Sequence, residues 1–281
     1  MAQANPAKWR LPTRSNAWRE IRASYAFVER NFFLVRRYWG WEIAFLIFNI
    51  TSSLSVMYIG KAQGTDANNL ILYLGIGTVV WAYLRAVFSN ISEMIVWERW
   101  EGTIEYTMMA PISRLTHMLG VSLFSIVYAL LRTVLLLIAL FLFFDVDLSH
   151  ANAGGALAII LVGSLSFVGV GIMAAVLPLL FTERGEEMTF IISSLLLLVS
   201  GVYYPVSVLP GWMQAAANIS PATYVLEGMR ATILDGTSTS HLGQYLIPMA
   251  IIGALTLPLG MFVFTSVERY AKRTGRLKRS G

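Results

Sequence analysis

The chain has 281 residues, of which 56% are hydrophobic and only 13% are charged, and it contains no cysteine. A soluble domain carries about 25% charged residues, so this composition predicts a membrane protein with several spans. Without cysteine the chain has neither a disulfide framework nor thiol chemistry. The formal net charge is +5, and its position along the chain decides its meaning, because Lys and Arg collect on the cytoplasmic side of membrane proteins.

The N-terminal segment, residues 1–41, carries eight Lys and Arg but only two acids. Either Ser15 or Asn16 is expected to cap a helix that continues to about Arg37. Aromatic and aliphatic side chains recur in this helix at spacings of three and four: Trp18, Ile21, Tyr25, Val28, Phe32 and Val35. Most charged residues fall off this stripe, which predicts an amphipathic helix lying in the membrane interface. Packing of this helix against a soluble partner is the alternative.

Six apolar runs are each long enough to cross a bilayer, since a crossing needs about 20 helical residues. They are expected near residues 42–60, 70–91, 117–142, 154–181, 189–208 and 242–265. If the N-terminus is cytoplasmic, the cytoplasmic segments hold 17 of the 21 Lys and Arg, whereas the external segments hold only Lys61 and Arg230. This asymmetry predicts that both termini are cytoplasmic in a multi-pass protein of the cell membrane.

Residues 201–235 interrupt the pattern of long apolar helices. Three prolines break this stretch, at Pro205, Pro210 and Pro221. Because proline lacks a backbone N–H and disfavours helix just before it, two short helices are predicted instead of one, at about 211–217 and 222–234. No charged residue occurs between Thr189 and Leu226, so the stretch is expected to dip into the bilayer and return.

Four short motifs in this stretch resemble the signature of ABC-2 type transporter permeases, the membrane subunits of ATP-binding-cassette exporters. They are Tyr204-Pro205-Val206-Ser207, Leu209-Pro210-Gly211-Trp212, Ser220-Pro221-Ala222-Thr223-Tyr224 and Glu227-Gly228-Met229-Arg230. The resemblance implies an all-α membrane protein with an interfacial helix in residues 1–41 and six transmembrane helices over residues 42–265. It also implies a re-entrant helical hairpin at 203–235, before the last span. A basic cytoplasmic tail would follow at 266–281.

The loop at residues 97–113, between the second and third predicted spans, carries the other half of the resemblance. It is similar to the family pattern Glu-Arg-x-x-Gly-Thr-x-Glu followed by Pro, through Glu98, Arg99, Glu101, Gly102, Thr103, Glu105 and Pro111. In the family this loop forms a coupling helix that sits in a cleft of the ATPase subunit. Glu101 and Glu105, four residues apart, are expected on one helix face, and Pro111 is expected to end the helix. An ordinary charged loop is the alternative, and Trp100 departs from the family pattern.

The translocation path or its gate is expected to use mainly aromatic residues and a few charges: Tyr73, Trp81, Arg132, Tyr203, Tyr204, Tyr224, Glu227 and Arg230. Arg132 lies in the middle of a span, where a charge costs at least about 2.5 kcal/mol. It is expected to line the path, to pair with a neighbouring span, or to reach the outer interface. Arg85 is expected to reach the inner interface or to meet Glu42. Glu227 and Arg230, three residues apart, are candidates for an ion pair.

No phosphate-binding Gly-x-x-x-x-Gly-Lys-Ser/Thr motif occurs, so ATP hydrolysis is not expected in this chain. The histidines, His117, His150 and His241, are scattered and predict no metal site. No catalytic site, cofactor or nucleic-acid partner is expected, and ATP and Mg²⁺ would be bound by a partner subunit. An ion-driven transporter would place carboxylates in the membrane core, and none is clearly there.

The sequence therefore predicts the permease subunit of an ABC exporter, with two ATPase subunits, a second permease and membrane lipids as its partners. An amphipathic drug, antibiotic or lipid is the expected substrate. Polysaccharide export is the alternative within the same class, and an ion-driven transporter or a membrane scaffold is less favoured.

Overall fold

The computed structural model describes residues 17–63, 67–144, 148–181 and 184–275. In these residues the regular structure is entirely helical, which confirms the all-α class. The α-helices are α1 (Ala17–Arg37), α2 (Trp39–Lys61), α3 (Ala67–Trp100), α4 (Ile104–Met109), α5 (Arg114–Phe141), α6 (Ala153–Ala174), α7 (Val176–Leu180), α8 (Gly185–Val199), α9 (Gly211–Ala217), α10 (Pro221–Ile233) and α11 (Gly243–Arg273). Two short 3₁₀ helices, η1 (Val206–Val208) and η2 (Thr239–His241), complete the set.

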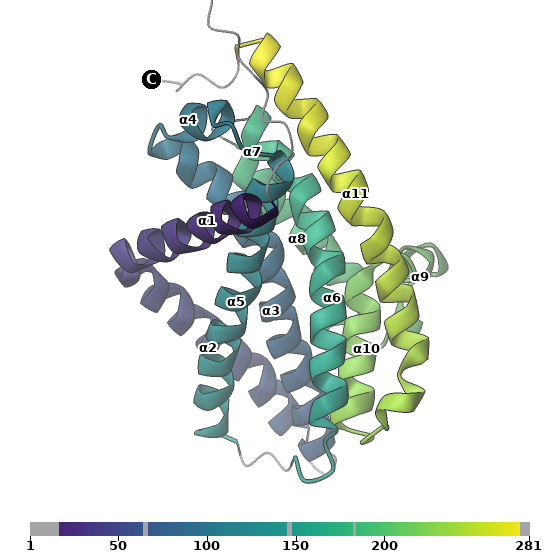
Figure 1. Ribbon diagram of the computed structural model, residues 1–281. Coiled ribbons are helices and arrows are strands. Elements are labelled where there is room, and N and C mark those ends of the chain that lie inside the picture. The colour runs from purple at the N-terminus through teal and green to yellow at the C-terminus, as the bar shows by residue number, and fades with distance from the viewer. Residues whose placement is uncertain (1–16, 64–66, 145–147, 182–183, 276–281) are drawn as a thin grey trace, which may run out of the picture.

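Five helical stretches are long and apolar enough to cross a membrane. They are Trp39–Lys61, Asn68–Trp100, Arg114–Phe141, Ala153–Leu180 and Gly243–Arg273. These correspond to five of the six predicted spans, and Figure 1 shows them side by side in one bundle. The short helix α4 lies at one end of this bundle, which we call the α4 end.

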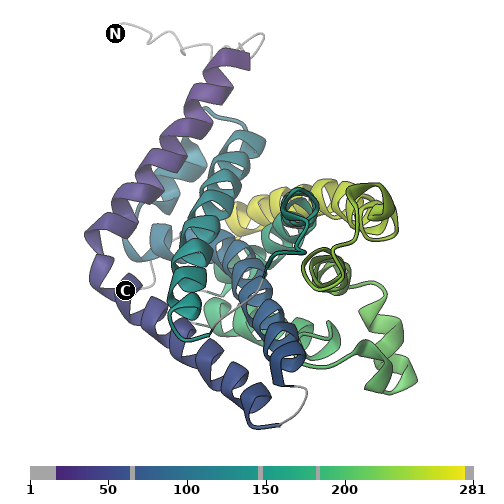
Figure 2. The ribbon, with the colours of Figure 1, turned by 90° about the horizontal axis from the view of Figure 1, so that it is seen from below.

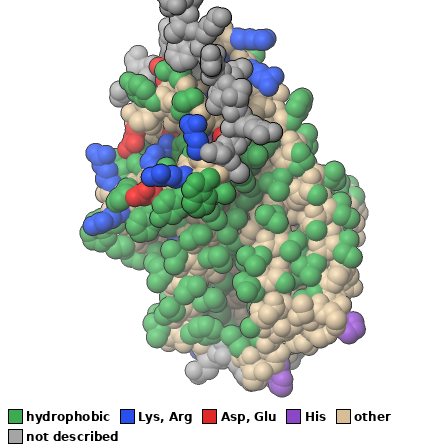
Figure 3. Space-filling model, viewed as in Figure 1, with side chains coloured by type: hydrophobic (Ala, Val, Ile, Leu, Met, Phe, Trp, Pro, Cys, Tyr) green, Lys and Arg blue, Asp and Glu red, His purple; other side chains and the backbone are tan. Residues whose placement is uncertain are grey.

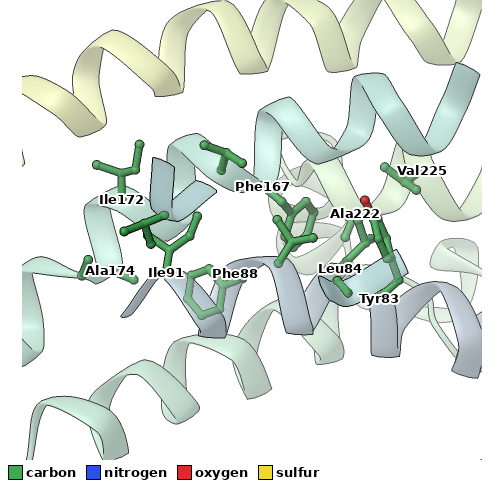
Figure 4. Close-up of a cluster of buried hydrophobic side chains, with 14 of the residues drawn as sticks. Tyr83, Leu84, Phe88, Ile91, Phe167, Ile172, Ala174, Ala222 and Val225 are labelled. Atoms are coloured by element: carbon green, nitrogen blue, oxygen red, sulfur yellow. The ribbon is translucent and has the colours of Figure 1, made fainter. Parts of the chain in front are cut away.

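The core of the bundle lies between α3, α6 and α10. Figure 4 shows the packed side chains Tyr83, Leu84, Phe88, Ile91, Phe167, Ile172, Ala174, Ala222 and Val225. Gly163 allows α6 and α10 to approach one another closely, because a Cβ at this position would lie only 2.5 Å from Cγ2 of Val225. The small residues of α6 therefore serve helix packing within the chain.

The fifth apolar run, predicted at residues 189–208, does not form one continuous helix. Helix α8 has 15 residues, fewer than the roughly 20 that a crossing needs. It runs antiparallel to α3, because the Thr189 and Ser92 hydroxyls hydrogen-bond at 3.0 Å near its start, and Val202 contacts Gly77 beyond its end.

Helix α10 continues in the direction of α8 after an interruption. Helix α10 is antiparallel to α6, because Val225 contacts Gly163 whereas Gly228, later in α10, contacts Ile159, earlier in α6. Helix α6 is parallel to α3, so α8 and α10 point the same way. The hydroxyls of Ser200 and Ser220 hydrogen-bond at 2.8 Å, so the two helices meet while residues 201–219 form an excursion between them. Helix α9 belongs to this excursion and lies at the edge of the bundle (Figures 1 and 2).

Helix α1 crosses the outside of the bundle near the α4 end and meets α2 at a sharp bend, as Figure 2 shows from below. It packs on α5, where Ser24 Oγ donates a hydrogen bond of 3.0 Å to the Thr116 carbonyl. Its apolar stripe is divided, because Val28 and Val35 pack on the core whereas Trp18 and Tyr25 are exposed. The predicted end at Arg37 is correct, and the expected capping residues Ser15 and Asn16 lie outside the described residues.

Charged side chains are unevenly distributed over the surface. Figure 3 shows Lys, Arg, Asp and Glu side chains gathered around α1 and towards the α4 end, above a broad apolar surface. The histidines visible on this face lie at the opposite end. The apolar surface fits the hydrocarbon part of a bilayer, and the charged end fits its boundary.

Candidate functional site

The predicted coupling loop forms a tight elbow between α3 and α4. Helix α3 ends at Trp100, and the chain then turns at Gly102, whose φ of +70° favours glycine. The Thr103 N–H donates a hydrogen bond of 2.9 Å to the Glu98 carbonyl, which closes the end of α3. Helix α4 ends at Met109, just before Pro111, as the proline predicted.

The structure separates the predicted coupling residues into buried and exposed ones. Glu101 and Glu105 are both exposed, but they do not share one helix face, because the turn at Gly102 lies between them. That expectation was wrong because a single helix was assumed across the elbow. The exposed surface also includes large apolar side chains, Trp100, Tyr106 and Met109. Glu98 and Arg99, in contrast, face the protein interior.

Glu98 holds three helices together at the α4 end. Its side chain is 1% exposed, and its Oε1 lies 2.6 Å from Nη2 of Arg30 on α1. Nε2 of His117, on α5, lies 3.3 Å from the same oxygen. A buried carboxylate is tolerated when it has such partners, so Glu98 fixes α3 to α1 and α5. Arg99 donates a hydrogen bond to the carbonyl of Leu179, which attaches α7 to the same point.

A second group of ion pairs fixes the end of α4. Glu268 of α11 lies 2.9 Å from Nε of Arg114 on α5 and 2.7 Å from Nζ of Lys272. Arg114 and Lys272 also donate hydrogen bonds of 2.5 and 2.9 Å to the Met108 carbonyl. We call this group, made of Arg114, Glu268 and Lys272, the α4 brace. It joins α4 directly to α5 and α11.

The sequence analysis missed the α4 brace because it assigned Glu268 to a basic tail. In the structure α11 continues to Arg273, so Glu268 and Lys272 lie four residues apart on one helix. This spacing was the available signal. The contact with Arg114 is long-range and had no local signal.

A cavity of about 380 Å³ lies between α2, α3 and α5, with the start of α8 at its rim. Arg132 lines it and pairs with Glu42 of α2, with Nη1 and Oε2 3.8 Å apart. Tyr128 also donates a hydrogen bond to Glu42. Arg132 thus has its partner on a neighbouring span, which was one of the three predicted alternatives. Arg85 does not pair with Glu42, and instead lies over the Phe190 ring at 5.3 Å.

Three carboxyl groups line the cavity. Glu93 lines it, because α3 continues as helix well past the predicted span end at residue 91. Glu42 and Glu186 line the same cavity.

Most of the remaining predicted path residues lie around the interruption between α8 and α10. Arg230 donates hydrogen bonds of 2.9 and 2.6 Å to the carbonyls of Gly201 and Val202, and its guanidinium lies 3.6 Å from the Tyr73 ring centroid. No ion pair joins it to Glu227, so the expected pair is wrong. The guanidinium of Arg230 is instead bound by two backbone carbonyls of the excursion.

The aromatic members of the predicted set have different environments. Tyr204 donates to the Leu198 carbonyl at 2.6 Å, and Tyr224 donates to the Asn218 carbonyl at 2.8 Å. Trp81 is buried, and Tyr203 is 37% exposed. The predicted set therefore divides between two places, with Arg132 at the cavity and the others elsewhere, most of them around the interruption.

An all-helical chain with five bilayer-length helices defines a multi-pass membrane protein. The model of the family "ABC-2 type transporter" matches residues 22–234, which is most of the chain. The chain therefore belongs to the ABC-2 type transporter family, as its motifs predicted, and is a membrane subunit of an ABC transporter. Such subunits are generally non-catalytic and work with ABC ATPase subunits. A search of curated proteins finds no match.

Proposed function

We propose that this chain is the permease subunit of an ABC exporter and that α4 with the elbow before it receives force from an ATPase subunit. The observation that carries this proposal is the contrast at the elbow. Its outer surface exposes Trp100, Glu105, Tyr106 and Met109, whereas its inner side is fixed by the α4 brace. Because α4 is rigidly attached in this way, a displacement of α4 is transmitted directly to α5 and α11.

In this proposal two ATPase subunits bind ATP and Mg²⁺ below a pair of permease subunits, and this chain contributes no catalytic group. Closure of the ATPases moves α4. The buried group of Arg30, Glu98 and His117, which we call the Glu98 cluster, transmits the motion to α1, α3 and α5. The two permeases then change their packing, and substrate leaves near the interruption between α8 and α10.

The proposed topology has six crossings within residues 42–265 and cytoplasmic termini in the cell membrane. Five crossings are the continuous helices, and the sixth is divided between α8 and α10. The charge asymmetry of the sequence and the charged α4 end support this orientation. Helix α1 lies in the inner interface, which suits its exposed Trp18 and Tyr25. Residues 266–281 extend into the cytoplasm.

The proposed substrate is an amphipathic drug, antibiotic or lipid. The cavity supports this class over a polysaccharide, because tryptophan, phenylalanine and tyrosine side chains line much of it. Such walls favour apolar groups combined with a few polar ones.

Co-purification with the candidate ATPase from the same organism tests the coupling role. The double variant Glu105→Arg, Tyr106→Ala changes two exposed side chains of α4, and we expect at least about a tenfold loss of ATPase binding. Glu29→Arg, an exposed acid on α1, is the matched control and is expected to bind as wild type does. If the folded double variant binds the ATPase as well as the wild type does, the elbow is not part of the interface with the ATPase.

A further inference from the structure

The cavity between α2, α3 and α5 contains two carboxyl groups that form no ion pair with the part of the chain that the structure describes. Glu93 and Glu186 both line it, and neither has an ion pair within 4.0 Å among the described residues. The charges of Glu186 and Glu42 act unfavourably on Glu93, whereas those of Arg132 and Arg85 act favourably on it. The third acid, Glu42, is satisfied by Arg132 and Tyr128.

The two arginines of the cavity form no ion pair with Glu93 or Glu186. Arg132 is already held by Glu42, and Arg85 lies over the Phe190 ring. Arg85 is also eight residues from Glu93 on α3, a separation of about 12 Å along the helix axis. The three carboxyl groups that line the cavity therefore outnumber its two guanidinium groups, and a cation placed near Glu93 and Glu186 would be attracted by both carboxylates.

The walls of the cavity suit a cation with an apolar body. Eight aromatic side chains line it: Tyr38, Trp41, Phe45, Phe48, Trp97, Trp100, Phe124 and Tyr128. Aromatic faces attract cations and pack against apolar groups. This combination of unpaired carboxylates with aromatic walls distinguishes the site from an ordinary gap between helices.

A buried amide belongs to the lining of the same site. Asn90 lines the cavity and is 5% exposed, and its Nδ2 is buried without a hydrogen-bond partner. A buried donor of this kind costs free energy unless something accepts from it. An acceptor group on a bound molecule would supply what the chain does not.

We propose that this cavity binds amphipathic organic cations, with the cationic centre near Glu93 and Glu186 and the apolar body against the aromatic side chains. A hydrogen-bond acceptor on the ligand takes the amide donor of Asn90. That such cations are also the transported substrates rests on the proposed permease function, whereas their binding to the cavity does not.

Binding of two ions of matched shape and opposite charge tests this inference. The purified full chain in nanodiscs is dialysed against tetraphenylphosphonium or tetraphenylborate, with protein-free nanodiscs as the blank. We expect the wild-type chain to bind the cation at least about tenfold more tightly than the anion. Glu93→Gln and Glu186→Gln are each expected to weaken cation binding about tenfold while leaving anion binding unchanged. Glu187→Gln, an exposed acid beside Glu186 that does not line the cavity, is expected to behave as wild type.

Several results would overturn the inference. They are equal affinity for the two ions, preference for the anion, and unchanged cation binding in Glu93→Gln when size-exclusion chromatography shows that this variant is folded. ATPase co-purification is measured on the same preparations. Cation binding without ATPase binding contradicts the proposed function alone, and ATPase binding without cation preference contradicts this inference alone.

Discussion

The α4 end and the interruption between α8 and α10 are stabilised by different kinds of interaction. At the α4 end, buried charges are paired across helices, as in the Glu98 cluster and the α4 brace. At the interruption, one arginine and the hydroxyl groups of Ser200, Tyr204 and Tyr224 donate to backbone carbonyls, and no ion pair is found among the described residues there. The first arrangement joins helices to one another, whereas the second satisfies a broken helix.

This difference follows from the structural requirement of each region. The α4 end brings helix ends from distant parts of the chain to one point, and paired charges fix their positions. The interruption leaves carbonyls without helical partners in an apolar environment, where each unsatisfied group costs free energy. Neutral donors and the guanidinium of Arg230 meet that need.

The largest effect is expected from Glu98→Gln. This change leaves Arg30 without its carboxylate in a largely buried site and should lower the free energy of unfolding by about 3 kcal/mol. Thermal or denaturant unfolding of the purified chain in detergent measures it. Glu101→Gln is the matched control, because its pair with Arg37 spans 3.9 Å and the Arg37 side chain is 70% exposed, so its expected effect is below about 0.5 kcal/mol. Similar losses in both variants would contradict the role of burial.

A smaller and more local effect is expected from Arg230→Met. The carbonyls of Gly201 and Val202 lose their donors, and we expect a loss of about 2 kcal/mol. Hydrogen–deuterium exchange should become faster in residues 200–220 and remain unchanged at the α4 end. Arg230→Lys keeps the charge without the guanidinium fork and should be intermediate. Faster exchange throughout the chain would show that the interruption is not a separate region.

Local sequence predicted the interruption well because proline chemistry decides it. Helix α9 has the predicted bounds, and α10 begins at Pro221, one residue before the predicted start, because proline is favoured in the first turn of a helix. The five long helices were also predicted, since apolar length requires no knowledge of partners. The end of α3 was placed too early, because its charged residues after position 91 suggested a loop. In the structure Glu98 is compensated by Arg30 and His117.

The partners of buried charges could not be predicted in the same way. Arg30 and Glu98 are far apart in sequence, and His117 was counted among scattered histidines although it joins this cluster. Glu268 and Arg114 are farther apart still. Only the folded arrangement of helices brings these groups together, so residue spacing carries no signal for them. The cavity around Glu93 was missed for the same reason.

The smallest effect is expected from Tyr204→Phe, which tests whether the interruption depends on single hydroxyl groups. Tyr204 donates a hydrogen bond of 2.6 Å to the Leu198 carbonyl near the protein surface, where other donors can replace it. We therefore expect a loss of only about 0.5–1 kcal/mol, measured by unfolding in detergent. Tyr224→Phe removes the equivalent bond to Asn218 and should match it. If either variant instead equals Arg230→Met, the hydroxyl groups rather than the guanidinium hold the two half-length helices in line.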